Sequence, residues 1–507
     1  MSASGEHIDY QALYQASELR NNQLAEQVQQ LQHQLHQITK LLGGFHQERF
    51  TTTPANPSQL VLNITPEPVA ARTSVVQAQK ITYVKTSSMS NTSAHPGRAR
   101  FSELLRREEI VLEPVEDVRH CKKIGEDITE VLEWKPGELY VKRYIRYKYV
   151  CPVAEDTGAT RIVIASLPVR ALDKSIAGEG LLAQIIIDKY VDHLPLNRQL
   201  DRFKRSGVTI AESTVADLLR GVCELIKPLG DALLAETVQS CYLHADETGI
   251  RVLDKAKQGT THKGFFWVYQ DSLNKLVYFD YQPGRGRAGP ESILKDFKGY
   301  LQTDGYDVYD SFDKEPGITQ LHCMAHARRK FHDALDNDKE CAEYALTEIQ
   351  KLYAIESASK EAGLSFDERQ EKRQREAVPI LKDLGEWMKQ RYMNGLPKGA
   401  IAEALAYSIK RWDTLCLYTT DGRLQIDNNA VERSIRPVAI GRKNYLFCGS
   451  HEAARRAAML YSLLGTCKLH GINPYDWLKD VLIRIPTHRI NKIQDLLPHR
   501  WQPLQEP

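Results

Sequence analysis

The chain has 507 residues, of which 42% are hydrophobic and 26% are charged, as is ordinary for a soluble globular protein. This length predicts roughly three or four domains. The net charge of +2 at pH 7 is almost neutral, so a nucleic-acid surface must come from local clusters of Lys and Arg and not from overall basicity. No apolar run approaches the roughly 18 residues that span a bilayer, and we expect no membrane partner.

Nine cysteines are scattered along the chain, at positions 121, 151, 223, 241, 323, 341, 416, 448 and 467. Their odd number, the absence of a CxxC pair and the absence of a secretory leader predict a cytoplasmic protein with free thiols. Cys121 and Cys151 lie at the two ends of a predicted β unit. With one neighbouring histidine they are too few for a tetrahedral zinc site.

The N-terminal segment predicts a coiled coil over residues 1–45. Apolar residues there alternate steps of four and three along the sequence, at Leu24, Val28, Leu31, Leu35, Ile38 and Leu42. This pattern favours self-association into a homodimer or higher oligomer, and the alternative is an amphipathic helix that packs on its own domain. Residues 46–115 are expected to form a flexible linker, because their composition shifts to Thr, Ser, Pro and Asn.

Two small units are predicted next, a β unit over 116–165 and a helical unit over 166–235. The segment LYVKRYIRYKYV is rich in strand formers, and two helices broken at Ser206-Gly207 suit a helix-turn-helix. A plain helical linker domain is the alternative. The helix-turn-helix hypothesis assigns DNA contacts to Arg198, Arg202, Lys204, Arg205, Ser213 and Thr214.

Residues 236–450 predict a catalytic domain of mixed strands and helices. Three strands (SCYLHADETGI, GFFWVYQD and KLVYFDYQ) precede a helix, and two further strands (YLQTDGYDVY and ITQLHCMAH) alternate with helices. This order is that of a ribonuclease H-like fold, here with a helical insertion at about 336–420. Residues 451–507 are expected to form a C-terminal helical unit, which makes the whole chain a multidomain α+β/α/β protein.

Three acids are the candidate catalytic residues of this domain. Asp246 ends the first predicted strand, Asp304 ends the fourth, and Glu432 opens a late helix in the segment IDNNAVERSIRPVAIGRKNYLFCGS. The acids are 58 and 128 residues apart, and the predicted topology brings them to one edge of the sheet. Three clustered carboxylates repel unless cations lie between them. We therefore expect two Mg²⁺ ions about 3.5–4 Å apart, with Mn²⁺ as the alternative metal.

Each acid also has a structural interpretation. Asp246 beside Glu247 is consistent with a solvated strand end, and Asp304-Gly305 is a common turn dipeptide. Asn429 and Glu432 have the spacing of a capping box. The basic residues that follow Glu432 favour the functional interpretation, because they can hold a polyanionic substrate; they are Arg433, Arg436, Arg442 and Lys443.

Four motifs closely resemble those of the insertion-sequence-66 family of bacterial transposases, the large DDE-type subunit: HADETGIRV, LQTDGYDVY, HCMAHARRKF and DNNAVERSIRPVAIGRKNYLFCGS. The resemblance implies that Asp246, Asp304 and Glu432 are a catalytic triad that binds divalent metal, usually Mg²⁺. Cys323 and His326 match the C-x2-H motif that follows the second aspartate in several DDE families, and simple core packing is the alternative. Many family members also carry paired CxxC motifs that form a zinc finger. Only Cys121 and Cys151 stand in this region, which leaves zinc binding in doubt.

The expected function is therefore that of a transposase acting on DNA. The helix-turn-helix and the β unit would read the terminal inverted repeats, and the acids would cleave a strand and join it to target DNA. The resemblance also implies small accessory proteins of the same element as partners. Two alternatives remain open from the sequence: a nuclease of the same fold that does not join strands, and an inactive copy that only binds DNA.

Overall fold

The computed structural model describes residues 101, 105–119, 121–135, 137–152, 160–254, 260–394 and 399–504. The predicted coiled coil and most of the predicted linker lie outside these residues. The linker prediction is wrong for Arg107–Leu112, which form strand β1. This strand pairs in parallel with β3, and its partners run from Val141 to Arg146. The apolar Ile110-Val111-Leu112 run is the strand signal within the polar stretch.

A four-stranded sheet follows, in which β3 is the central strand and pairs with the other three. Strands β2 and β3 form a long antiparallel hairpin, which turns at Gly137 with a φ of +85°, a conformation that glycine adopts without strain. Its strands beyond β1 are β2 (Lys122–Lys135), β3 (Glu138–Pro152) and β4 (Thr160–Ile164).

The two cysteines of this sheet form a disulfide between Cys121 and Cys151, which corrects the prediction that all nine thiols are free. Antiparallel pairing explains why the two cysteines lie close together, because their neighbours Lys122 and Val150 are opposite each other at the open end of the hairpin. The other seven cysteines are unpaired.

Four helices connect this sheet to the next one. They are α2 (Glu179–Tyr190), α3 (Leu196–Arg205), α4 (Glu212–Leu225) and α5 (Lys227–Val238). The chain breaks between α3 and α4 at Ser206-Gly207, as the sequence predicts. Gly207 has a φ of +80°, which ends α3. Within the described residues, no helix is both long and apolar enough to cross a membrane.

The central sheet has five strands in the order β7-β6-β5-β8-β9. Strands β5, β6 and β7 are antiparallel neighbours, whereas β5, β8 and β9 run parallel. Helix α6 precedes β8, a short helix α7 follows it, and α8 follows β9. The bounds are β5 (Tyr242–Leu253), β6 (Thr261–Asp271), β7 (Leu276–Gln282), α6 (Ala288–Leu294), β8 (Gly299–Thr303), α7 (Asp307–Asp310), β9 (Ile318–His322) and α8 (Met324–Asp333).

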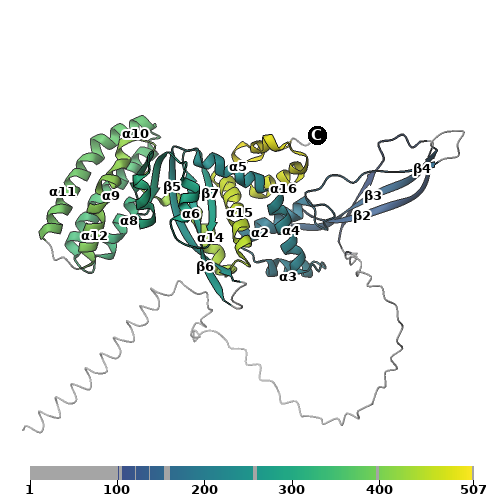
Figure 1. Cartoon of the computed structure of the whole chain (residues 1–507), viewed down its shortest axis with the longest axis horizontal. Helices are drawn as coiled ribbons and strands as arrows, with labels where there is room; N and C mark the ends of the chain where they lie inside the picture. The colour runs from purple at the N-terminus through teal and green to yellow at the C-terminus, as the bar shows by residue number, and fades with distance from the viewer. Residues whose placement is uncertain are drawn as a thin grey trace, which may run out of the picture. The chain divides into compact units, whose positions relative to one another are not determined.

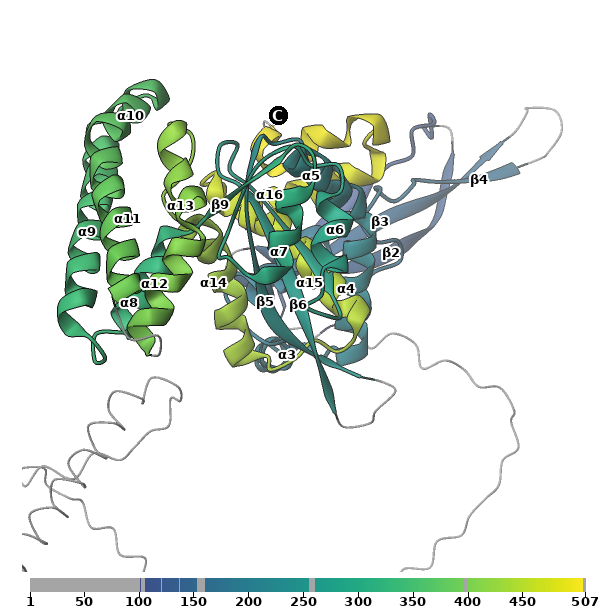
Figure 2. The same cartoon turned by 60° about the vertical axis from the view of Figure 1, so that its left-hand side comes forward.

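The region expected as a helical insertion consists of helices with a core of their own. Ala345, Leu352, Leu381 and Leu405 belong to this core, which reaches the sheet at Leu321. Its helices run alongside one another (Figure 2). They are α9 (Lys339–Glu361), α10 (Phe366–Lys372), a π-helical turn (Arg373–Ala377), α11 (Val378–Asn394), α12 (Ala400–Lys410) and α13 (Trp412–Cys416).

Three further helices complete the chain: α14 (Asn429–Asn444), α15 (His451–Leu469) and α16 (Pro474–Arg484). Figure 1 shows the sheet between the insertion, drawn in green, and the helices α15 and α16 with α2–α5.

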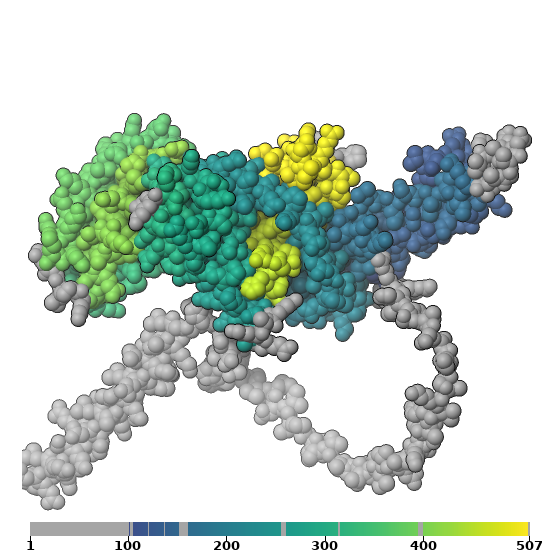
Figure 3. All heavy atoms as spheres, in the orientation of Figure 1, coloured from purple at the N-terminus to yellow at the C-terminus, as the bar shows by residue number. Residues whose placement is uncertain are grey.

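Strand alternation decides which helices cover which face of the central sheet. On β6, Phe266 and Val268 face one core and Trp267 and Tyr269 face the other, as a period of two requires. The first core also contains residues of α2, α4, α5, α14, α15 and α16. The space-filling view shows the yellow C-terminal residues packed against teal residues that lie far earlier in the sequence (Figure 3). This core therefore crosses the boundaries at 235 and 450 that the sequence suggests.

Candidate active site

The parallel pairing of β5 and β8 brings two of the candidate acids to neighbouring positions. His244 lies opposite Gln302, and Asp246 and Asp304 each come two residues later. Asp304 directly follows β8, as expected, but β5 continues through Asp246 to Leu253. The prediction that Asp246 ends its strand is therefore wrong, although the two strands are neighbours as predicted.

Alternation along β5 also separates the two consecutive acids, Asp246 and Glu247. The side chain of Asp246 shares a face with His244, which contacts the residue preceding α14. Glu247 points to the opposite face, where its carboxylate accepts a 2.8 Å hydrogen bond from Arg285 Nε. Its side chain is only 2% exposed. Of this pair, only Asp246 belongs to the face that carries α14.

Asn428 fixes the start of α14 against β5. Its side-chain Oδ1 lies 2.9 Å from His244 Nδ1, and its Nδ2 donates to the carbonyl of Ala245 at 2.9 Å. Its backbone N–H donates to the sulfur of Cys323 at 3.1 Å. Asn428 and Cys323 are both fully buried, and burial raises the pKa of the Cys323 thiol to about 12. One residue therefore connects β5, the residue after β9 and the helix that carries Glu432, through its side-chain amide and its backbone N–H.

Glu432 lies on the first turn of α14, facing α8. Its Oε1 is 3.9 Å from Nε2 of His326, and its side chain is 33% exposed. Helix α14 begins after Asn428 without a side-chain cap, and Asn429 instead bonds to Asp427 through its Nδ2 at 2.6 Å. The capping-box interpretation therefore does not explain Glu432.

The electrostatics of Asp246 indicate that Asp304 and Glu432 are among its charged neighbours. The pKa of Asp246 is raised well above its ordinary value, first by burial and then by the nearby carboxylates of Asp304, Glu247 and Glu432. His326 is affected by two of the same acids: burial lowers its pKa, while Asp304 and Glu432 oppose that shift. The C-x2-H motif thus contributes a buried thiol beneath α14 and an imidazole beside the acids.

The helical insertion holds the turn that carries Asp304. Tyr407 donates its hydroxyl to the carbonyl of Asp304 at 2.8 Å, and Arg411 donates to the carbonyl of Gly305 at 3.0 Å. Gly305 has a φ of +87°, and a Cβ there would meet Arg411 Nε at 2.8 Å. Sequence reasoning missed Tyr407 and Arg411, because they lie about a hundred residues from the turn and have no motif of their own.

The donor chemistry of the site suits a hard divalent cation. Asp246, Asp304 and Glu432 offer carboxylate oxygens, the ligands that Mg²⁺ and Mn²⁺ prefer, and within the described residues Asp246 and Asp304 have no basic ion-pair partner. The same residues contain no group of three His, Cys, Asp or Glu side chains close enough to form a complete ligand set. The acids therefore fit a metal by type and location, and not as a preformed coordination shell.

The basic residues after Glu432 are not equivalent in the structure. Arg433, Arg436 and Lys443 are exposed on one face of α14 and have no ion pair within the described chain. Arg442 is half-buried, and its guanidinium donates to the carbonyl of Gly249. Arg442 therefore links α14 to β5, whereas the other three are available to a ligand.

A similar division holds for the predicted helix-turn-helix. Arg202 forms an ion pair with the buried carboxylate of Asp188 and lies over the ring of Trp134 at 5.3 Å, so it stabilises the fold. The other basic residues on α3 are exposed; they are Arg198, Lys204 and Arg205. On α4, Ser213 is exposed and Thr214 is half-buried.

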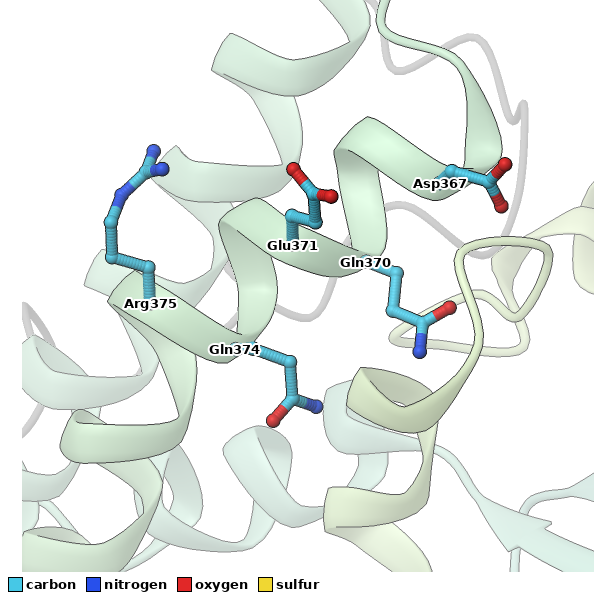
Figure 4. Close-up of a pocket in the computed structure, with 5 residues that line it drawn as sticks. All are labelled: Asp367, Gln370, Glu371, Gln374 and Arg375. Carbon is cyan, nitrogen blue, oxygen red and sulfur yellow. The ribbon is translucent and has the colours of Figure 1, made fainter.

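Neither the disulfide nor a hollow on the helical insertion adds to this site. Cys121 and Cys151 are bonded to each other, so they provide no thiolates for zinc. A hollow of about 570 Å³ lies on the insertion. Figure 4 shows that its lining side chains come from α10 and the adjoining π-helical turn and do not converge, since Asp367 and Arg375 point away from each other.

Comparison with known proteins links most of the chain to one family. Residues 174–456 match the model described as "Transposase IS66 family", and residues 462–499 match "IS66 C-terminal element". Residues 119–153 match "zinc-finger binding domain of transposase IS66". The uncharacterized protein y4hP of Sinorhizobium fredii (strain NBRC 101917 / NGR234) is 32% identical over 92% of this chain and 88% of its own length. The uncharacterized protein y4jD of the same strain is 30% identical over 96% and 98%.

Proposed function

We propose the function of this chain from its family, because the chain belongs to the transposase IS66 family, as its motifs predict. The proposal is that it binds the terminal inverted repeats of an insertion sequence, cleaves a strand at each end and joins the freed 3′-hydroxyl to target DNA. The observation that supports this proposal is that Asp246 and Asp304 follow paired positions on the neighbouring strands β5 and β8, while Asn428 joins the start of the helix that carries Glu432 to β5.

The strand order supports a ribonuclease H-like catalytic domain, in which three antiparallel strands precede two parallel ones. In this proposal Asp246, Asp304 and Glu432 hold the divalent metal. When bound, Mg²⁺ or Mn²⁺ would lower the pKa of the attacking water or hydroxyl and stabilise the leaving oxygen. The chain itself positions the acids, through Asn428 at the start of α14 and through Tyr407 and Arg411 at the Asp304 turn.

The exposed face of α14 would hold the DNA backbone next to the acids. Arg433, Arg436 and Lys443 lie on the helix that carries Glu432 and have no protein ion pair within the described residues. Each guanidinium can bind a phosphate with two parallel hydrogen bonds. Exposed residues of α3 and α4 would contact DNA at a second place, as a helix-turn-helix does. We also propose self-association through residues 1–45 and accessory proteins of the same element as partners.

Strand transfer by the purified full-length chain tests this proposal. Labelled DNA carrying the ends of the element is incubated with target plasmid and Mg²⁺, and nicked and joined products are separated. We expect joined molecules, and a loss of at least about 10³-fold in Asp304→Asn with DNA binding retained. The matched control is Asp296→Asn, because Asp296 is an exposed acid away from the site, and it should act like the parent.

Three other outcomes would contradict the proposal. Nicks without joined products would indicate a nuclease, and binding without metal-dependent cleavage would indicate an inactive DNA-binding copy. Full activity of Asp304→Asn would remove the assignment of the acids.

A further inference from the structure

A second hollow, of about 530 Å³, lies beside Glu432 and is formed by three helices. Asn429 contributes from α14, three residues before Glu432, and Ala325 contributes from α8, next to His326. The remaining lining residues come from α8 and α9; they are Arg328, Arg329, His332, Gln350 and Tyr353.

The charged side chains that line this hollow are all basic. Arg328 and Arg329 are exposed, and neither has an ion pair within the described chain. Arg329 is close enough to His326 to lower the pKa of that imidazole, and Arg328 lowers the pKa of Tyr353 against the larger effect of burial. No carboxylate lines the hollow. An anion is therefore the ligand that this surface would attract.

The donors of the hollow suit phosphate oxygens in particular. Two adjacent guanidinium groups provide planar pairs of N–H donors, which match phosphate geometry. The amide of Gln350 and the imidazole of His332 add further polar groups at the rim. The carboxylate of Asp427 lies next to the hollow, where it accepts from the backbone N–H and the Nδ2 of the lining residue Asn429 at 3.0 and 2.6 Å and is close to Tyr353. It forms no ion pair with Arg328 or Arg329 within the described residues.

The hollow continues from the basic face of α14, because its lining residue Asn429 lies one turn before Arg433 on the same face of that helix. His326 is 3.9 Å from Glu432, and Arg329 lies three residues later on the same helix, about 5–6 Å away between Cβ atoms. A DNA strand that passes Glu432 would thus meet basic side chains of both α14 and α8. We propose that this hollow binds a backbone phosphate of the substrate DNA, roughly one or two nucleotides from the reactive phosphodiester. The inference rests on the proposed function, and it assigns Arg328 and Arg329 as DNA-positioning residues.

The proposal is tested by making the backbone phosphates of the DNA neutral one at a time. A duplex carrying one end of the element is made with a methylphosphonate at each position in turn around the cleavage site, and the affinity of the full-length chain is measured. The parent protein should lose about 10- to 100-fold in affinity at one or two neighbouring positions. A variant with Arg328→Gln and Arg329→Gln should show a similar loss on unmodified DNA and no further loss at those positions.

Two matched variants separate charge from geometry. Arg328→Lys with Arg329→Lys keeps the charge but loses the paired donors, so it should retain the salt dependence of binding and recover only part of the affinity. Arg375→Gln removes an exposed arginine of the insertion, paired with Glu376, and should leave the methylphosphonate profile unchanged.

Two results would overturn the assignment while leaving the proposed function intact. In one, the glutamine variant and the methylphosphonates would weaken binding additively at every position. In the other, a mononucleotide would bind in the hollow, but the Arg328→Gln, Arg329→Gln variant would bind DNA as tightly as the parent protein does. Cleavage and joining by the parent on the same unmodified duplex report the proposed function separately. Absence of both binding and cleavage would overturn both proposals.

Discussion

Charged side chains are abundant both in the four-stranded sheet and around Glu432, but their surroundings differ. On the sheet, Arg143 contacts Glu109 at 2.8 Å, and Asp127 is shared by Lys148 at 2.8 Å and Arg146 at 3.6 Å. Around Glu432, by contrast, the exposed Arg433, Arg436 and Lys443 of α14 and Arg328 and Arg329 of α8 have no ion pair within the described residues. Asp246 meets other acids.

The difference teaches that charge in the sequence is not the same as charge available to a ligand. The sheet satisfies its charges within the fold, since acids of β1 and β2 lie beside bases of β3. Around Glu432 the fold brings carboxylates near one another and leaves several bases without an ion pair. Such an arrangement costs stability and is typical of a functional site. Four predictions can break or sharpen this contrast.

The largest effect should come from removing the unpaired bases of α14. Replacing Arg433, Arg436 and Lys443 by Gln should lower affinity for element-end DNA by about 100-fold or more. It should also reduce the slope of log K against log salt by about 2–3, because roughly 0.9 counterion is released per phosphate contact. Fluorescence anisotropy over a range of salt concentrations measures both quantities.

The matched change on the sheet replaces Arg143, Arg146 and Lys148 by Gln. These bases must break an ion pair before they can bind a phosphate. The fold loss of DNA affinity should therefore be at most about a tenth of that of the α14 variant. Equal losses for the two triple variants would show that pairing does not decide availability.

The next effect should follow from Asn428→Ala, which removes the amide that joins α14 to β5. The fully buried carbonyl of Ala245 and the ring of His244 would lose their partner, at a cost of about 2–4 kcal/mol in the free energy of unfolding. Strand joining should fall by at least about tenfold at a temperature where the variant stays folded, because Glu432 loses its alignment. Denaturant unfolding and product analysis measure the two effects.

Asn444→Ala is the control at the other end of the same helix, where the side chain makes only a 3.5 Å contact with the carbonyl of Ile440. A comparable loss of joining in both variants would argue against a specific role for Asn428.

A smaller effect of opposite sign is expected for Asp246→Asn in protein kept free of metal with EDTA. Burial and neighbouring acids raise the pKa of Asp246, so its ionised form destabilises the folded state at neutral pH. The variant should melt about 1–3 °C higher. This gain should shrink as pH falls from the raised pKa of the folded state to the unfolded value near 3.8, and vanish below it.

Mg²⁺ provides the complementary measurement on the same pair of proteins. Its addition should raise the melting temperature of the parent more than that of the variant, because a ligand stabilises the state that binds it. A lower melting temperature for metal-free Asp246→Asn would contradict the idea that the acids repel one another.

The smallest effect should be that of Asp127→Asn on the sheet. The change in melting temperature should have the opposite sign to that of Asp246→Asn. The hydrogen bond from Lys148 lowers the pKa of Asp127, so the ionised carboxylate stabilises the folded state. Asp127→Asn should therefore melt slightly lower at neutral pH, and the difference should disappear as pH falls through the lowered pKa. Calorimetry between pH 3 and 7 gives the sign, and a stabilised variant would refute the pairing.

Much of the candidate site could be predicted from the sequence, because its signals are local. The strands around Asp246 and Asp304 are recognisable from their aromatic and β-branched residues, and the helix of Glu432 from its starting residues. The boundary of β5 was less accessible, because the strand continues through two acids that usually end one. The positions of Tyr407 and Arg411 could not be inferred, since a helical pattern does not reveal which distant turn a helix will contact.

The sequence by itself determined the family and most of the order of strands and helices, since these depend on residue type and spacing, and it proposed three candidate acids. Only the tertiary structure decided which of two consecutive acids shares a face with α14, because that depends on the register of β5 against its neighbours. It also decided that Arg442 and Arg202 are engaged by the fold while Arg433 and Arg329 are not. Whether a basic side chain can bind a ligand depends on the partners that folding brings near it, and those partners lie far away in the sequence.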